Sequence, residues 1–117
     1  MIDIDRVAQI HLAIQPTDFR ASFDSLAAIT QTVLKRNPLS GHLFVFHNKK
    51  RDRIKILYWQ DNGFCLWYKR LEAGKYKFPR LDAEAMTITR QELRLLLEGI
   101  DISKIQRLPA VRPVQVY

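Results

Sequence analysis

The chain has 117 residues, of which 47% are hydrophobic and 26% are charged, and its formal net charge is +7 at pH 7. This length and composition are typical of one folded soluble domain and argue against a largely disordered chain. No apolar run approaches the roughly 20 residues of a membrane-spanning helix, and Cys65, the only cysteine, excludes an internal disulfide.

The N-terminal segment contains acidic residues where a signal peptide carries basic ones, and it lacks a long apolar core. We therefore expect a cytoplasmic protein. Residues 7–14 (VAQIHLAI) partly alternate between apolar and polar positions and predict a short strand. This strand should end at Gln15, because the residue before a proline disfavours the helical conformation.

An amphipathic helix is predicted next, with apolar residues recurring every three or four positions from Phe23 to Leu34. Thr17 is a candidate N-cap with Asp18 in the first turn, and Ser22 is a second candidate start. Asp18 and Arg20 fit a short-range ion pair or cap that anchors this helix. Asn37 and Pro38 should end it.

Residues 42–71 contain the strongest structural signal, three apolar-rich runs at 43–46, 54–59 and 64–68 separated by polar turns. This pattern predicts a three-stranded antiparallel meander. Asn62 and Gly63 are the preferred pair for a two-residue type I′ turn, which would place Trp59 opposite Leu66. Both faces are rich in aromatic residues, so one should pack on the first helix and the other on a second helix, a partner or a ligand.

Residues 72–81 interleave basic and aromatic residues, which permits two interpretations. Such a segment suits single-stranded or distorted nucleic acid, by base stacking and phosphate contact. Alternatively it is an edge strand with Tyr76 and Phe78 pointing inward and lysines outward, and the spacing favours this interpretation.

A second helix is predicted after Thr89, which forms a capping-box pattern with Glu92. Together the elements predict a small α+β domain. An antiparallel β-meander of about four to five strands should pack against the N-terminal amphipathic helix and a short C-terminal helix. We expect this single domain to cover residues 1–103 and residues 104–117 to form an extended, flexible tail.

Positive charge is concentrated in one third of the chain, because residues 47–80 hold ten basic and three acidic residues while the remainder holds nine of each. Charge gathered on one element is typical of proteins that bind a phosphate backbone. A solvated face that protects sheet edges is the alternative. The basic residues are Lys49, Lys50, Arg51, Arg53, Lys55, Lys69, Arg70, Lys75, Lys77 and Arg80.

Features of an enzyme or a cofactor site are missing from the sequence. The three histidines are scattered, one cysteine cannot build a zinc ribbon, and the four glycines form no phosphate-binding loop. Four aspartates could combine in a two-metal nuclease, but each is explained locally by a helix or a turn. We expect no catalytic activity, metal, cofactor, small-molecule substrate or membrane contact.

Several segments resemble a bacterial mobile-element family: PTDFR at 16–20, GHLFVF at 41–46, DRIKILYW at 52–59, NGFCLWYKRL at 62–71 and LLLEGI at 95–100. They are similar to the TnpB-type accessory proteins of IS-sixty-six-family insertion sequences, which are distinct from the RNA-guided nuclease of the same name. The resemblance implies a protein that is encoded beside a larger transposase and assists transposition. In this family pattern Asp18, Arg20, Asn62 and Gly63 are interpreted as structural residues.

Two functions remain open. In the first, the protein contacts DNA inside the transposition complex, the ten basic residues neutralise phosphates, and Trp59, Trp67 and Tyr76 stack on or wedge between bases. In the second, the protein is an adaptor that uses its aromatic meander, or the predicted helix at residues 93–100, to bind the transposase or a second copy of itself. We place DNA contact first.

Overall fold

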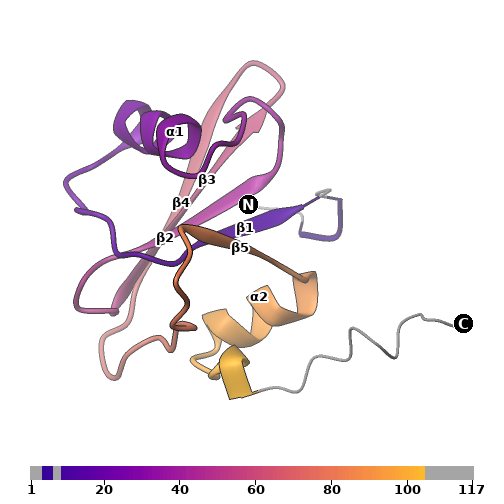
Figure 1. Ribbon diagram of the computed structural model, residues 1–117. Helices are drawn as coiled ribbons and strands as arrows, with labels where there is room; N and C mark the ends of the chain where they lie inside the picture. Colours follow the sequence, from indigo (N-terminus) through magenta and orange to yellow (C-terminus); the bar gives the residue numbers. More distant parts are fainter. Residues whose placement is uncertain (1–3, 7–8, 105–117) are drawn as a thin grey trace, which may run out of the picture.

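The structure is a computed structural model that describes residues 4–6 and 9–104 (Figure 1). The predicted flexible tail from residue 105 onward, and Val7 and Ala8 of the first predicted strand, lie outside the described residues. The described elements are one five-stranded sheet, two α-helices and two short 3₁₀ helices, η1 (Ile4–Arg6) and η2 (Ile102–Lys104).

The sheet has the strand order β4-β3-β2-β1-β5. Its strands are β1 (Ile10–Ala13), β2 (Leu43–His47), β3 (Arg53–Gln60), β4 (Gly63–Arg70) and β5 (Ala85–Ile88). Strands β2, β3 and β4 pair antiparallel in chain order, and β5 pairs antiparallel with β1.

The sheet is mixed, and the prediction of an antiparallel sheet is therefore wrong for one strand pair. Strand β1 pairs with β2 in parallel, with Ile10 opposite Leu43. Between them the chain crosses one face of the sheet through α1 (Phe23–Thr32), which returns it to the end where β1 began. Such a crossover connection is the one that joins parallel neighbours.

The hairpin between β3 and β4 turns one residue earlier than predicted. Gln60 pairs with Gly63, so the two loop residues are Asp61 and Asn62, and Asp61 has a positive φ of 54°. The register is shifted by two residues, so that Trp59 lies opposite Phe64 instead of Leu66. Because a shift of two leaves every side chain on its original face, the predicted division of residues between the two faces still holds.

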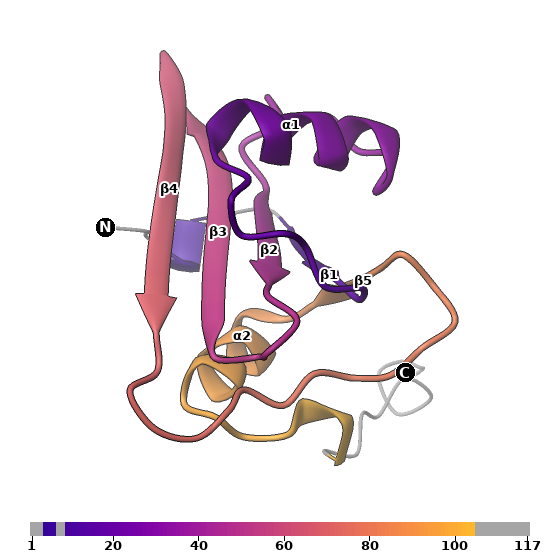
Figure 2. The ribbon, with the colours of Figure 1, turned by 90° about the vertical axis from the view of Figure 1, so that its left-hand side faces the viewer.

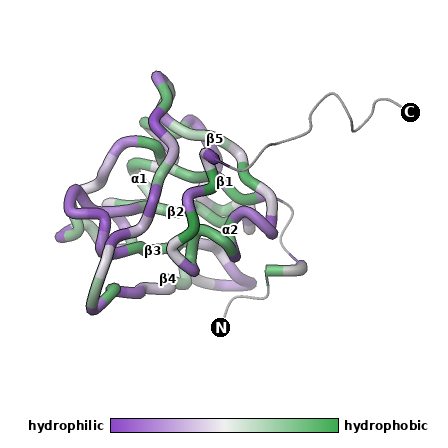
Figure 3. Tube along the Cα trace, turned by 90° about the horizontal axis from the view of Figure 1, so that it is seen from below, coloured by the Kyte–Doolittle hydropathy of each residue, from purple (hydrophilic) through white to green (hydrophobic). Residues whose placement is uncertain are grey.

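Each face of the sheet is covered by one helix, α1 on one side and α2 (Arg90–Leu97) on the other (Figures 1 and 2). The α1 side is centred on Leu26, Phe44 and Leu57, and the α2 side on Ile56, Leu93 and other fully buried residues. Hydrophobic segments follow the inner strands between the helices (Figure 3). In residues 4–6 and 9–104, neither helix has the length and hydrophobicity required to cross a bilayer.

The predicted N-cap is correct for α2, whereas the first candidate N-cap for α1 is wrong. The capping box of α2 is confirmed: Thr89 Oγ1 accepts from Glu92 N at 3.0 Å, and Thr89 N donates to Glu92 Oε1 at 2.8 Å. Helix α1 begins at Phe23 with Ser22 at the N-cap position, so the second candidate start is correct and Thr17 is not the N-cap, although the Ser22 side chain makes no capping hydrogen bond. The helix ends at Thr32, before the predicted stop at Asn37 and Pro38. Instead Thr17 N donates to His47 O at 2.8 Å, which holds the preceding segment against the end of β2.

Candidate nucleic-acid interface

Most of the predicted DNA-binding residues gather at one end of the sheet, where β2 and β4 end and β3 begins (lower end in Figure 2). The chain after β4 returns along the β2–β3 turn, since Leu71 N donates to Asp52 O at 2.8 Å and Tyr76 N to Arg51 O at 2.7 Å. We call this surface the basic end. It comprises Lys49, Lys50, Arg51, Arg53, Lys69, Arg70, Lys75, Lys77 and Arg80.

The side chains of the basic end are largely accessible to solvent. Arg51 and Arg53 are partly buried, whereas the other seven residues are exposed. One acidic neighbour is paired, because Arg70 Nε lies 2.9 Å from Glu72 Oε2. Nine of the ten predicted residues therefore lie at one end of the fold, and seven of them are exposed.

The β2–β3 turn is held by the side chain of Asn48. Its Oδ1 accepts hydrogen bonds from Asp52 N at 3.1 Å and Arg53 N at 3.0 Å, and its Nδ2 donates to Asp52 Oδ1 at 2.6 Å. That last bond is the main reason why the pKa of Asp52 is lowered. Arg51 has a positive φ of 61° and donates its N–H to Asn48 O. The turn thus presents its lysines from a well-hydrogen-bonded backbone.

His47 connects three segments beneath the basic end. Its Nε2 lies 3.1 Å from Ile14 O, at the end of the β1 segment, and its ring stacks on Phe78 with the centroids 3.8 Å apart. Burial lowers the pKa of His47 and favours the neutral imidazole. Both ring nitrogens face carbonyl oxygens, which only accept, with Nδ1 3.4 Å from Asn48 O. We assign the proton of the neutral ring to Nε2, because its contact with Ile14 O is the shorter one.

Asp18 and Arg20 form the predicted ion pair, with Arg20 Nη2 2.6 Å from Asp18 Oδ2. The pair belongs to the turn before α1, where Arg20 N also donates to Asp18 Oδ1, and it does not cap the helix. These hydrogen bonds from Arg20 lower the pKa of Asp18 to about 2. Any contribution of the pair to stability is present above the unfolded pKa of about 4 and is lost as the pH falls toward 2.

Lys55 does not belong to the basic end, which corrects its assignment as a DNA-binding residue. Its side chain is 6% exposed. Its Nζ donates to Phe19 O at 3.1 Å and to Ala21 O at 2.7 Å. The same ammonium lies 4.9 Å from the ring centroid of Phe19 and 5.0 Å from that of Tyr68. Lys55 therefore ties the segment before α1 to the sheet.

The three candidate stacking aromatics are not brought together. Tyr76 is fully buried in the core on the α2 side, so it cannot stack on a base, and residues 72–81 form no strand. Trp59 is half-buried near the hairpin at the opposite end of β3, in edge contact with Phe64. Trp67 is half-buried and packs against the α2-side core.

We predict that Tyr76→Phe leaves the protein folded and raises its free energy of unfolding by about 1 kcal/mol. The hydroxyl of Tyr76 is buried and has no hydrogen-bond partner among the described residues, and burial raises its pKa. Removing an unsatisfied buried hydroxyl relieves its desolvation cost. Urea unfolding monitored by circular dichroism measures the change, and a loss of stability would show that the hydroxyl has a partner.

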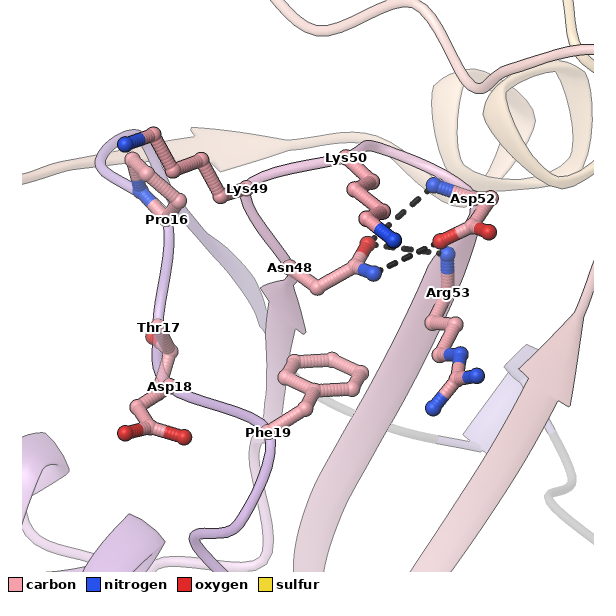
Figure 4. Close-up of a pocket in the computed structure, with 9 residues that line it drawn as sticks. All are labelled: Pro16, Thr17, Asp18, Phe19, Asn48, Lys49, Lys50, Asp52 and Arg53. Atoms are coloured by element: carbon pink, nitrogen blue, oxygen red, sulfur yellow. Dashed lines mark hydrogen bonds between the residues drawn. The ribbon is translucent and has the colours of Figure 1, made fainter.

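A groove lies beside the basic end, between residues 16–19 and the β2–β3 turn (Figure 4). Its volume is about 540 Å³. No pattern in the sequence indicates this groove, because the two segments are about thirty residues apart and are brought together by the parallel pairing of β1 with β2 and by the bond from Thr17 N to His47 O. The roles of Asn48 and His47 were missed for the same reason: polar residues at a strand end give no signal of their partners.

The family described as IS66 Orf2 like protein matches residues 8–107. The chain belongs to this family. The IS66 Orf2-like family has an accessory role associated with transposition, so the resemblance found in the sequence is confirmed.

Two relatives of this IS66 Orf2-like protein occur in Sinorhizobium fredii (strain NBRC 101917 / NGR234). The uncharacterized protein y4jC is 37% identical over 116 residues, which cover 99% of each chain. The uncharacterized protein y4hO is 38% identical over 101 residues, which cover 86% of this chain and 88% of y4hO. No solved structure matches the chain.

Proposed function

We propose that this IS66 Orf2-like protein binds DNA through the basic end and acts in this way as an accessory factor in transposition. The observation that supports the proposal is the convergence of nine basic residues on one end of the fold, seven of them exposed. Phosphate contacts by lysine and arginine supply most of the affinity of non-specific DNA binding. They also position a protein on the DNA backbone.

The arrangement of the basic end favours a role in DNA binding over a role in solubility alone. Charges that only protect a sheet edge would be expected along the outer side of β4, where Lys69 and Arg70 lie. Here the charge extends across the turn between β2 and β3 and along the loop from Lys75 to Arg80. These segments are joined to one another by backbone hydrogen bonds, so their charges act as one surface.

The test is the affinity for a duplex that contains the end of the insertion sequence, measured by fluorescence anisotropy at several salt concentrations. Contact with about five phosphates predicts a slope of log affinity against log salt of about −4 to −5. Failure to bind at low salt, or an affinity that does not respond to salt, would contradict the proposal. No contribution from Lys55 or Tyr76 is expected, because both are buried.

A protein-protein adaptor is the second candidate, and the outer edge of β4 favours it. Within the described residues β4 pairs only with β3, so the outer edge of this eight-residue strand is unpaired (left-hand edge in Figure 2). Tyr68 on this strand is 48% exposed. An exposed edge of this kind pairs readily with a strand of another protein, here the transposase or a second copy of this chain.

Co-purification with the transposase distinguishes the adaptor from the DNA binder. An adaptor complex should persist at high salt and be lost in Trp67→Ala, with Trp59→Ala as the control at the far end of the hairpin. A complex that forms only in the presence of DNA and dissociates in salt would exclude this function. Circular dichroism of each variant shows whether the fold is retained.

A further inference from the structure

The groove beside the basic end has two chemically different walls. Phe19 and Pro16 supply apolar surface on one side, and the β2–β3 turn supplies Lys49, Lys50 and Arg53 on the other (Figure 4). The lining residues are Pro16, Thr17, Asp18, Phe19, Asn48, Lys49, Lys50, Asp52 and Arg53. A ligand that fills this groove would need both a flat apolar part and a negatively charged part.

The carboxylates of the groove are already engaged. Asp18 is paired with Arg20, and Asp52 accepts a hydrogen bond from Asn48. Among the groove cations, Arg53 has a buried Nε without a hydrogen-bond partner among the described residues, and its Nη1 lies 3.3 Å from Tyr68 Oη. The cationic donors that the groove offers to an anion are therefore the exposed ammonium groups of Lys49 and Lys50, while Arg53 adds positive charge from a partly buried position.

Both walls are held in place before any ligand arrives. Residues 16–19 are fixed at Thr17 by its bond to His47 and at Phe19 by Lys55, whose ammonium binds the Phe19 carbonyl. The opposite wall is fixed by the three hydrogen bonds of Asn48. A site whose walls need no ordering loses less conformational entropy on binding.

We propose that this groove binds one unpaired nucleotide of a DNA strand, with a phosphate at Lys50 and its base or sugar against Phe19. The volume of about 540 Å³ lies within the range of small-molecule sites. A phosphate alone would occupy little of that space and leave the apolar wall unused. In duplex DNA the base faces are stacked on one another, so only an unpaired nucleotide offers a phosphate and a free ring together.

This inference rests on the proposed DNA-binding function, and it is tested by comparing two DNA molecules of equal length. One is a blunt duplex and the other carries a short single-stranded overhang. Fluorescence anisotropy should show about tenfold tighter binding to the overhang, since stacking of one base on an aromatic side chain has about this effect. Phe19→Leu, which keeps the apolar volume but removes the ring, should abolish the preference and leave blunt-duplex affinity unchanged.

A matched pair of charge variants provides the second readout. Lys49→Gln with Lys50→Gln removes two exposed cations from the groove, and Lys69→Gln with Lys75→Gln removes two exposed cations of the basic end outside it. The groove variant should lose more affinity for the overhang than for the blunt duplex. The control variant should lose affinity for both equally, and neither change should unfold the protein, because all four side chains are exposed.

Equal affinity of the unmodified protein for overhang and blunt DNA would overturn the inference, as would a full overhang preference in the Lys49/Lys50 variant. In either case salt-dependent duplex binding would leave the proposed function standing. Absence of binding to both DNA molecules at low salt would overturn the inference and the proposed function together.

Discussion

Replacing Lys49, Lys50 and Lys69 together by glutamine should weaken binding to an element-end duplex by about 100-fold at about 0.1 M salt. All three side chains are exposed at the basic end, two on the β2–β3 turn and one near the end of β4. If each neutralises one phosphate, the magnitude of the salt slope should also fall by about 3.

A second triple variant, which removes the same number of charges elsewhere, distinguishes direct phosphate contact from the effect of net charge on DNA affinity. Glutamine at Arg6, Lys35 and Arg36 removes the same three charges from exposed positions outside the basic end. This variant should retain most of the duplex affinity and nearly all of the salt slope. Equal losses in both triple variants would mean that DNA responds only to the overall charge of +7, and the assignment of the basic end would be wrong.

Lys55→Met should lower the free energy of unfolding by about 3 kcal/mol and leave the salt slope of DNA binding unchanged. Methionine keeps the length of the side chain but removes the ammonium, so the carbonyl groups of Phe19 and Ala21 lose their charged donor. Urea unfolding measures the first effect and anisotropy titration the second.

Lys49→Met is the control for that substitution, since the same chemical change occurs on an exposed side chain. It should change stability by no more than about 0.5 kcal/mol. Suppose instead that Lys55→Met folded with full stability and lost as much DNA affinity as substitution of an exposed lysine of the basic end. Lys55 would then have to be counted among the DNA-binding residues.

Local patterns in the sequence predicted local structure well. The capping box at Thr89 and Glu92 depends only on residues within one turn of helix, and it forms as predicted. The parallel pairing of β1 with β2 could not be predicted in this way, because it joins residues more than thirty positions apart. The hairpin was placed one residue late, since Asn62 and Gly63 favour a type I′ turn only when side-chain pairing does not select another register.

The clustering of basic residues along the sequence was predictable, but which of their side chains are exposed to solvent was not. Lys55 and Arg53 lie on the same face of β3, and only the segment from Phe19 to Ala21 folding over that face buries Lys55. Tyr76 was correctly expected to point inward in one interpretation of residues 72–81, and it does so from an irregular segment instead of an edge strand.

Amide chemical shifts of the ¹⁵N-labelled protein, recorded while an element-end duplex is added, test the central proposal most directly. We expect the perturbed amides to cluster in residues 48–53 and 69–80, at one end of the sheet, and added salt to reverse the changes. Perturbations confined to the outer edge of β4 or to α2, or no change at low salt, would contradict it.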